Sequence, residues 1–390
     1  CMLLVGARQV GKSTLIKHEF KDFNRANFDD RLTRMQAKEE PKLFLLNNPQ
    51  PLFIDEVQKE SSILEDIKQI VDESDERGMF LLSGSQKLEL IKGMSESLAG
   101  RVSISELTGL SMREIYGVKF NRHFIPTDAY IKEREKEIVK YDNIWEIIHK
   151  GSYPELYDID RDWQEYYSSY VATYLERDIN ELVAADGITF TKFLTAVAAR
   201  TGELLNYSNI AGDVGVSEPT IKNWISILER TGIVYLLQPY SASALKRAIK
   251  TPKLYFRDTG LACYLTRWLT ADTLKCSAVA GNMFETFVVS EILKSYSNEG
   301  KDYRFNIFYY RGKDRNASGE NEIDLVIEED GVLYPVEIKM SGNPKASMGA
   351  TNQVLDKVSD KKRGLGVILC LIDKKTYLRE NLVALPIEFI

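Results

Sequence analysis

Short apolar runs separated by amphipathic stretches fill the first third of the chain. Residues 3–5, 52–54 and 79–82 are almost uniformly apolar, which is typical of parallel strands that are buried on both faces of a sheet. Residues 63–71 instead place apolar side chains three or four positions apart, which is the spacing of one helix face. This alternation predicts a parallel sheet covered by helices.

The same patterns predict the remaining elements. In the first region we expect a strand at 24–30 and a helix at 35–46, which ends before the turn-forming cluster at 47–51. Residues 125–186 have a mostly helical pattern with strongly charged exposed faces. Further along we expect helices at 190–205, 207–214, 218–230, 280–296 and 346–358, and strands at 233–237, 305–311, 322–327, 332–339 and 364–372.

A glycine-rich loop follows the first apolar run. Its pattern is Gly6-x-x-x-x-Gly11-Lys12-Ser13, and an amphipathic stretch comes next. The N–H groups of such a loop and of the following helix N-terminus form a cradle for phosphate groups. Lys12 is placed to reach the β- and γ-phosphates of ATP, and the Ser13 hydroxyl to bind Mg²⁺. The predicted nucleotide-binding residues are Gly6, Ala7, Arg8, Gln9, Val10, Gly11, Lys12, Ser13 and Thr14.

Two carboxylates end the apolar run at 52–54. Asp55 and Glu56 follow it directly, so we expect them at the carboxyl edge of the sheet, beside the glycine-rich loop. Asp55 is predicted to hold Mg²⁺ through water, and Glu56 to polarise the attacking water as the catalytic base. The alternative is a strand that ends in two solvated acids.

Serine residues end the next apolar run. Ser83 and Ser85 follow residues 79–82 and are predicted to lie at the same sheet edge. Two interpretations stay open for each serine. It contacts the γ-phosphate or the attacking water, or it belongs to a turn that caps the next helix.

The middle of the chain has the pattern of a winged helix-turn-helix. A short helix at 207–214, a turn containing Gly215 and Ser217, a helix at 218–230 and a strand at 233–237 occur in that order. In a DNA-binding module the second helix would present its polar residues to the major groove, namely Glu218, Thr220, Lys222 and Asn223. Winged helices also bind proteins, so DNA and a protein partner are equally open alternatives here.

A locally basic segment follows this region. The net charge of the chain is −6, so any nucleic-acid contact needs a local positive patch. Segment 246–275 supplies one, with interleaved aromatic residues, and it predicts a surface that follows a phosphate backbone. The alternative is a solvated basic face over an aromatic core. Its basic residues are Lys246, Arg247, Lys250, Lys253, Arg257, Arg267 and Lys275.

A second set of acidic residues lies in the last third. Asp324 comes early in one predicted strand, and Glu337 and Lys339 are two positions apart on the next, so the latter two side chains share one face of the sheet. This resembles the PD-(D/E)xK motif of the restriction-endonuclease-like fold. The resemblance implies that Asp324 and Glu337 bind Mg²⁺ and that Lys339 acts on the attacking water or on the phosphate. Glu285, on the preceding helix, is a further candidate ligand.

Together the motifs resemble a prokaryotic family of AAA-type ATPases with a conserved C-terminal domain of uncertain function. The resemblance implies that Lys12, Ser13, Asp55 and Glu56 serve nucleotide and Mg²⁺. Arg101 and Arg177 become candidates for an arginine that contacts the γ-phosphate, with ion pairs to neighbouring acids as the alternative. The resemblance rests on residues 6–14, 53–58, 82–86 and 97–102, and it continues at 151–155 and 174–179.

Composition narrows the class of protein. Hydrophobic residues make up 44% and charged residues 28% of the 390-residue chain, which is typical of a globular protein of two or three domains. The four cysteines form no Cys-x-x-Cys pair, which argues against a zinc site or a disulfide framework. With no long apolar run and no visible signal peptide, we expect a cytoplasmic protein that makes no membrane contact.

The sequence therefore predicts an α/β protein of four regions. They are an AAA-type P-loop ATPase core at 1–124, a helical lid or connector at 125–188, a winged-helix-like domain at 189–275 and a PD-(D/E)xK nuclease-like domain at 276–390.

We expect a Mg²⁺-dependent ATPase whose nucleotide state controls the C-terminal domains as they act on DNA, in a chain that can form an oligomer. The alternative is an ATP-gated switch or scaffold that binds a protein and does not cleave nucleic acid. A nuclease regulated by nucleotide is a third possibility.

Overall fold

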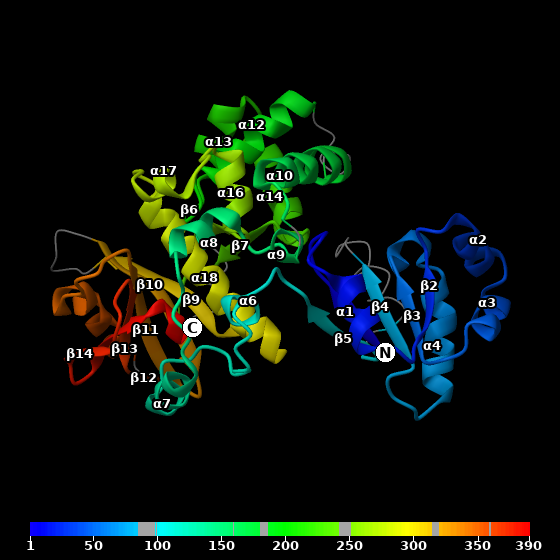
Figure 1. The fold of residues 1–390 in the computed structure, drawn as a ribbon, viewed down its shortest axis with the longest axis horizontal. Coiled ribbons are helices and arrows are strands. Elements are labelled where there is room, and N and C mark those ends of the chain that lie inside the picture. The colour runs from blue at the N-terminus through cyan, green and yellow to red at the C-terminus, as the bar shows by residue number, and fades with distance from the viewer. Residues whose placement is uncertain are drawn as a thin grey trace. The chain divides into compact units, whose positions relative to one another are not determined.

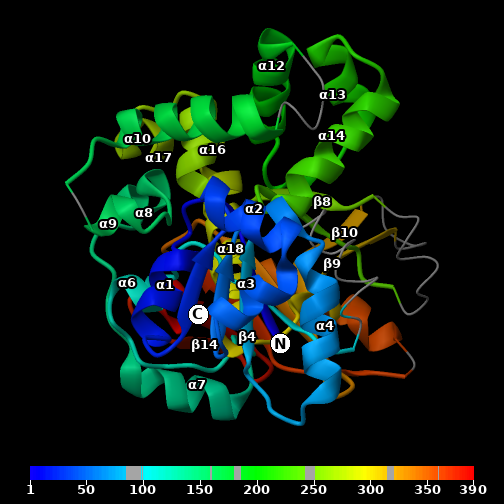
Figure 2. The ribbon, with the colours of Figure 1, turned by 90° about the vertical axis from the view of Figure 1, so that its right-hand side faces the viewer.

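The computed structural model describes residues 1–84, 98, 100–158, 160–179, 186–241, 251–313, 320–358 and 360–390. These residues form two units (Figures 1 and 2). Unit 1 contains Cys1–Gly109 and Ile227–Ile233, and unit 2 contains Leu110–Ser226 and Val234–Ile390. The predicted division into four regions is not tested by this partition and stays a prediction.

Unit 1 is built on a five-stranded parallel sheet. The parallel arrangement that the apolar runs predicted is confirmed, and the fifth strand, β5, was not predicted. The order of its strands is β2-β3-β4-β1-β5, so β4 separates the strand that precedes the glycine-rich loop from the strand that ends in Asp55. The strands are β1 (Met2–Val5), β2 (Asn24–Asn27), β3 (Leu52–Asp55), β4 (Phe80–Gly84) and β5 (Ser103–Glu106).

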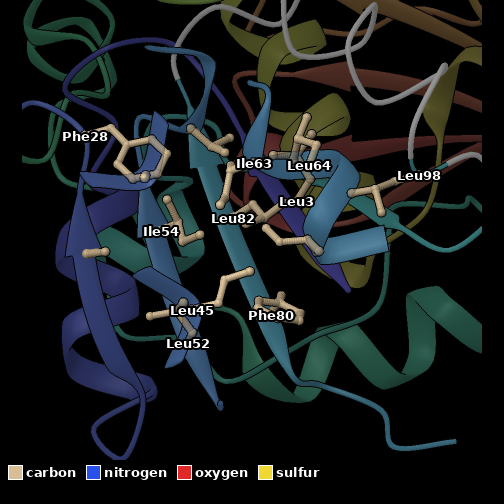
Figure 3. Packing of buried hydrophobic residues seen from close by; sticks show 14 of the residues in the cluster. Leu3, Phe28, Leu45, Leu52, Ile54, Ile63, Leu64, Phe80, Leu82 and Leu98 are labelled. Carbon is tan, nitrogen blue, oxygen red and sulfur yellow. The ribbon is translucent and has the colours of Figure 1, made fainter. Parts of the chain in front are cut away.

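Apolar side chains cover both faces of this sheet. Figure 3 shows Leu3, Ile54 and Leu82 on one face, in the same cluster as Ile63 and Leu64. The neighbouring residues in each strand, Leu4, Phe53 and Leu81, form a second cluster with Ile16. Because successive side chains of a strand point to opposite faces, the continuous apolar runs reflect burial on both sides.

The helices of unit 1 differ from the prediction in one place. The expected single helix at 35–46 is wrong, because the chain forms two helices there. Pro41 begins the second helix, where its missing N–H costs nothing, whereas inside one long helix it would break the hydrogen-bond ladder. The helical elements are α1 (Lys12–Glu19), α2 (Arg31–Glu39), α3 (Pro41–Asn47), η1 (Val57–Glu60) and α4 (Ile63–Glu73).

Unit 2 begins with a helical region. The tyrosines of α10 belong to the core of this region. Tyr166, Tyr167 and Tyr170 are each at most 1% exposed. The elements are α6 (Met112–Ile115), α7 (Asp128–Arg134), η2 (Glu135–Glu137), α8 (Ile144–Lys150), α9 (Glu155–Asp158), α10 (Trp163–Tyr170) and η3 (Val171–Ile179).

A three-stranded antiparallel sheet and several helices follow. The sheet order is β6-β8-β7. The expected helix at 190–205 is too long, because α12 ends at Ala198 and Gly202, with φ +81°, turns the chain into β6. The elements are α12 (Gly187–Ala198), β6 (Glu203–Leu204), α13 (Tyr207–Val214), α14 (Glu218–Arg230), β7 (Val234–Leu237), β8 (Lys253–Phe256), α16 (Thr259–Leu265) and α17 (Ala271–Lys275).

The C-terminal part of unit 2 is a mixed sheet that begins after a long helix. The predicted hairpin is confirmed, since β10 and β11 are antiparallel and Leu325 lies opposite Val336. The strand order is β14-β15-β13-β11-β10-β9, and β12 pairs with β11. The predicted helix at 346–358 is a 3₁₀ element interrupted at Gly349, and β14 and β15 were not predicted.

The bounds of this region are α18 (Ala280–Glu299), η4 (Tyr303–Phe305), β9 (Ile307–Lys313), β10 (Glu320–Glu329), β11 (Val332–Lys339), η5 (Ala346–Lys357), β12 (Lys362–Arg363), β13 (Gly366–Cys370), β14 (Thr376–Arg379), β15 (Leu382–Pro386) and η6 (Ile387–Phe389). In the parts of the chain that the structure describes, every helix is too short or too polar to span a bilayer.

Candidate functional site

The glycine-rich loop joins β1 to α1 in a tight backbone path. Gly11 precedes α1 with φ +92°, in the left-handed region that favours glycine. A Cβ atom added to Gly6 would lie 2.2 Å from the carbonyl oxygen of Leu107, so no side chain fits there. The two glycines of the motif are thus required by geometry, and the loop can expose its N–H groups ahead of the helix.

Lys12 folds back over this loop. Its side chain is buried at 7% exposure, and Nζ donates hydrogen bonds to the carbonyl oxygens of Gly6, at 3.0 Å, and Ala7, at 2.9 Å. Burial lowers the pKa of Lys12, while the charges of Glu56 and Asp55 oppose that shift. In the described part of the chain, the hydrogen bonds of the ammonium group therefore go to neutral acceptors of the loop.

Asp55 connects three elements of unit 1. Its carboxylate accepts a hydrogen bond of 2.7 Å from the Ser13 hydroxyl of α1 and another from the Ser83 hydroxyl of β4. Since β4 lies between β1 and β3 in the sheet, Ser83 can reach the end of the neighbouring strand. The structure thus brings Ser13 and Asp55 together, as the two predicted Mg²⁺ ligands require.

The helix-capping role predicted for Ser83 is wrong, whereas contact with the γ-phosphate or the attacking water stays a prediction. Ser83 is fully buried inside β4, so it does not cap a helix, and its hydroxyl is used by Asp55. It is a positioning residue for that carboxylate. Ser85, the other candidate, lies outside the described residues.

Glu56 follows Asp55 in an unusual backbone conformation. Its φ is +54° and its ψ is +44°, a left-handed conformation that costs a non-glycine residue about 1 kcal/mol or more. The side chain accepts a hydrogen bond from the Gln58 amide. The strand therefore ends at Asp55, and the chain turns at Glu56. Gln58 fixes the Glu56 carboxylate through its amide, a role that sequence analysis missed.

The oxygen donors of this site fit Mg²⁺. A hydroxyl and a carboxylate are hard ligands, and Mg²⁺ on a nucleotide takes its remaining ligands from phosphate and water. Ser13 and Asp55 supply that minimal set. Among the described residues, no three His, Cys, Asp or Glu side chains are arranged as a metal site by themselves, which a phosphate-bound Mg²⁺ does not require.

The two candidate arginines have different outcomes. Arg101 forms an ion pair with Asp72 of α4, and both side chains are exposed. This contact raises the pKa of Arg101 and lowers that of Asp72. The ion-pair alternative thus describes Arg101 in this conformation. Arg177 lies on η3, but its side chain is outside the described residues.

Unit 2 brings together the acids predicted in the last third. Asp324 lies on β10 and Glu337 on β11. Lys339 Nζ is 2.7 Å from Asp324 Oδ2 and 2.9 Å from Glu337 Oε2, and the N–H of Ile338 donates to Asp324 Oδ2 at 2.8 Å. The hairpin thus places the two carboxylates of the motif in contact with the Lys339 ammonium group.

Glu337 is the most strongly perturbed member of this group. It is 3% exposed, and burial together with the charge of Asp324 raises its pKa to about 8. Its Oε1 atom is buried without a hydrogen-bond partner. A buried carboxylate oxygen in that state fits a proton or a cation, so Asp324 and Glu337 have the donor chemistry that a divalent metal ion needs.

Further charged residues extend the group. Glu285 of α18 accepts hydrogen bonds from Lys253, at 3.2 Å, and from the Tyr255 hydroxyl, at 2.6 Å. Lys253 also lies 2.6 Å from Glu322 of β10. We call this set the acidic centre: Glu285, Glu322, Asp324 and Glu337, with Lys253 and Lys339.

The placement of Lys253 corrects one prediction. Sequence analysis assigned it to a basic surface at 246–275, but it is 4% exposed and points into the acidic centre. Three of the basic residues lie outside the described residues, namely Lys246, Arg247 and Lys250. Among the described basic residues of the segment, Arg267 and Lys275 are exposed. The described residues therefore supply less positive surface than the sequence suggested.

The polar face of α14 is partly as predicted. Lys222 and Asn223 are exposed, while Ile221 and Trp224 belong to the core. Lys222 lies 2.7 Å from Glu218 of the same helix, so the negative charge of Glu218 offsets the positive charge of Lys222 on this face.

Comparisons with known proteins agree with the geometry of unit 1. Residues 1–116 match the family model described as an AAA domain. The N-terminal region of this chain is therefore similar to an AAA domain, which supports an ATPase-type unit. Residues 141–272 and 280–390 match two models described as domains of unknown function, DUF8612 and DUF4143.

Similar whole proteins carry no stated function. The uncharacterized proteins Rv2008c of Mycobacterium tuberculosis and Mb2031c of Mycobacterium bovis are each 28% identical over 365 residues, which cover 91% of this chain and 74% of theirs. A solved structure, protein VC1899 from Vibrio cholerae, aligns over 98% of this chain and 94% of its own with 11% identity. Its TM-score of 0.19 supports no argument about the fold.

Proposed function

We propose that the protein binds ATP and hydrolyses it with Mg²⁺ in unit 1. The observation that carries this proposal is the joint placement of Lys12, Ser13 and Asp55. One lysine lies over the glycine-rich loop, and a hydroxyl-carboxylate pair ends the strand beside it. The match to an AAA domain over the same residues supports the proposal.

Each residue has a distinct task in this mechanism. The N–H groups of the loop and of the first turn of α1 bind phosphate oxygens. Lys12 exchanges its neutral carbonyl acceptors for phosphate oxygens, which is favourable because a negatively charged acceptor attracts the ammonium group more strongly than a neutral one does. Ser13 and Asp55 would hold Mg²⁺, which neutralises developing charge when bound. Glu56 orients and polarises water for attack.

The acidic centre favours a second candidate activity, the Mg²⁺-dependent cleavage of DNA. Its support is the meeting of Asp324, Glu337 and Lys339 on adjacent strands, together with the unpartnered Glu337 Oε1. We propose that Asp324 and Glu337 would bind the cation, and that Lys339 orients water or contacts the phosphate. The order α12-β6-α13-α14-β7-β8 supports the winged-helix hypothesis.

A protein partner is the alternative to DNA. The inward position of Lys253 and the pairing of Lys222 with Glu218 both reduce the positive surface available to a phosphate backbone. These contacts favour an ATP-gated switch that binds a protein through the middle region and cleaves nothing.

One assay tests these proposals together. ATP turnover is measured with Mg²⁺, with and without duplex and single-stranded DNA, and DNA integrity is followed in the same samples. We expect turnover that requires Mg²⁺ and Lys12. Stimulation by DNA supports action on DNA, whereas unchanged turnover with intact DNA favours the protein-partner alternative. Absence of turnover in the folded wild-type chain would refute the ATPase proposal.

A further inference from the structure

A lysine from a different sheet reaches the acidic centre. Lys253 belongs to β8 of the three-stranded sheet, whereas Asp324 and Glu337 belong to the mixed sheet. Its Nζ atom is 2.6 Å from Glu322 Oε1 and 3.2 Å from Glu285 Oε1. Because a buried ammonium group is costly unless it is paired, this double contact ties Glu285 and Glu322 to Lys253.

The two lysines divide the carboxylates between them. Lys339 contacts Asp324 and Glu337, and Lys253 contacts the other two acids. Glu337 Oε1, an oxygen of the pair that Lys339 contacts, is buried without a hydrogen-bond partner. Glu285 Oε1, in contrast, already accepts hydrogen bonds from Lys253 and from Tyr255. A buried ligand atom without a hydrogen-bond partner therefore lies on the Asp324–Glu337 side.

Charge limits how many divalent cations this centre can hold. In the described part of the chain, its four carboxylates meet two ammonium groups, and Arg311 lies opposite Glu322 across the β9–β10 pair. The net negative charge is thus two at most. One divalent cation neutralises it, whereas two would leave an uncompensated positive charge in a largely desolvated site.

Solvent and ions can reach the Lys253 side of the centre. Lys253 and Glu322 line a pocket of about 720 Å³, whose other lining residues include Arg200, Asn206 and Arg311. If no second cation binds near Glu322, the reason would be the positive charge of Lys253 and its contact with Glu322, because the pocket leaves a path for ions to this carboxylate.

We propose that Lys253 is a positioning residue that takes the place of a second cation, so that the acidic centre binds one divalent cation, on the Asp324–Glu337 side. The inference rests on the proposed metal-dependent role of this centre and specifies it. Lys253 does not contact the cation. It holds Glu285 and Glu322 and lowers the negative charge that attracts metal ions.

The test is Mn²⁺ binding to the full chain without nucleotide, measured by calorimetric titration and by the EPR signal of unbound Mn²⁺. The double variant Asp324→Asn/Glu337→Gln defines the binding that belongs to the centre. We expect one centre-dependent Mn²⁺ in the wild type. Lys253→Gln is expected to bind it about tenfold more tightly, because one nearby positive charge is removed.

Two further variants separate charge from structure. Lys253→Arg keeps the positive charge and is expected to retain wild-type affinity. Lys361→Gln removes a lysine that lies 2.7 Å from Glu328 on the same strand as Glu322, and it should leave Mn²⁺ binding unchanged. Lys253→Met, which preserves the aliphatic chain, replaces Lys253→Gln if the latter does not fold.

The outcomes distinguish two failures. Equal or weaker Mn²⁺ binding by the folded Lys253 variant would overturn the role of Lys253 alone, as would two centre-dependent Mn²⁺ ions in the wild type. If the double variant binds Mn²⁺ like the wild type, the centre is not a metal site. Then both this inference and the DNA-cleavage candidate fail, while the ATPase proposal stands.

Discussion

The proposed nucleotide site of unit 1 and the acidic centre of unit 2 use lysine in opposite ways. Lys12 donates to two backbone carbonyl groups, which are neutral acceptors that an anionic phosphate outcompetes. Lys253 and Lys339 contact four carboxylates. An incoming metal ion must therefore share those carboxylates with lysine. The first site is arranged to receive an anion, and the second is partly neutralised before any cation arrives.

The two sites also differ in how far apart their residues lie in the sequence. The loop and the first turn of α1 supply most of the nucleotide site, from Gly6 to Thr14, and Asp55 completes it. The acidic centre draws on β8, α18, β10 and β11, from Lys253 to Lys339. A local site can be recognised from a motif, whereas a dispersed one depends on the packing of elements.

The largest effect is expected from a substitution that changes the proposed nucleotide site alone. Lys12→Ala should reduce ATP turnover at least about a hundredfold, because it removes the cation that stabilises the transferring phosphate. Lys17→Ala, which changes an exposed lysine of the same helix, is the control and should turn over ATP normally. Turnover at the wild-type rate in Lys12→Ala would remove the basis for the site.

The corresponding change in the acidic centre is Asp324→Asn. It should lower the rate of Mg²⁺-dependent DNA cleavage at least about a hundredfold. ATP turnover should stay unchanged, because the nucleotide site is a separate set of residues. Asp330→Asn alters an exposed turn residue after the same strand and serves as the matched control. Cleavage that persists in Asp324→Asn would exclude the acidic centre as its source.

The pH dependence of stability should distinguish the two sites further. The folded pKa of Glu337 is raised to about 8, above the unfolded value near 4.3. The folded state therefore binds a proton more strongly, and this stabilisation is present at low pH and is lost as the pH rises through about 8. With metal removed by chelator, the wild type should lose about 2–3 kcal/mol between pH 6 and pH 8.5, because stability falls by about 1.4 kcal/mol per pH unit until the folded pKa is reached.

Glu337→Gln carries no titrating carboxyl group at this position and should lose less stability over the same pH range. The measurement is the midpoint of urea unfolding at each pH in the presence of chelator. Equal losses in the two proteins would show that another group is responsible.

A smaller effect is expected from the hydroxyl that positions Asp55. Ser83→Ala should lower stability by about 1–2 kcal/mol, since it deletes a buried hydrogen bond to a carboxylate, and it should raise the Mg²⁺ concentration needed for turnover. Ser62→Ala removes an exposed hydroxyl that bonds to the half-buried Glu60 and is the control for stability. An unchanged Mg²⁺ requirement would mean that Asp55 keeps its position without Ser83.

The smallest effect on stability is expected at Arg101. Its ion pair with Asp72 lies on the surface, where such pairs contribute little, so Arg101→Ala should unfold at the wild-type temperature. ATP turnover then gives the decisive comparison. A large loss of turnover would assign Arg101 to the γ-phosphate in another conformation, and normal turnover would leave it as a surface ion pair.

Errors in the sequence predictions have identifiable physical causes. The split of the helix at 35–46 follows from Pro41, a signal that was present in the sequence. The early end of α12 follows from Gly202 and from pairing of β6 with β8, which only the fold reveals. The interpretation of Lys253 as a surface cation ignored carboxylates that lie more than thirty positions away in the sequence.

The sequence alone determined the glycine-rich loop, four of the parallel strands of unit 1 (β1 to β4) and the β10–β11 hairpin. Each of these depends on interactions among near neighbours, or on a side-chain period that burial imposes on one segment. Only the tertiary structure decided that Ser83 holds Asp55 and that Lys253 enters the acidic centre. Those contacts join separate strands, and the identity of a residue does not record which distant charge it will meet.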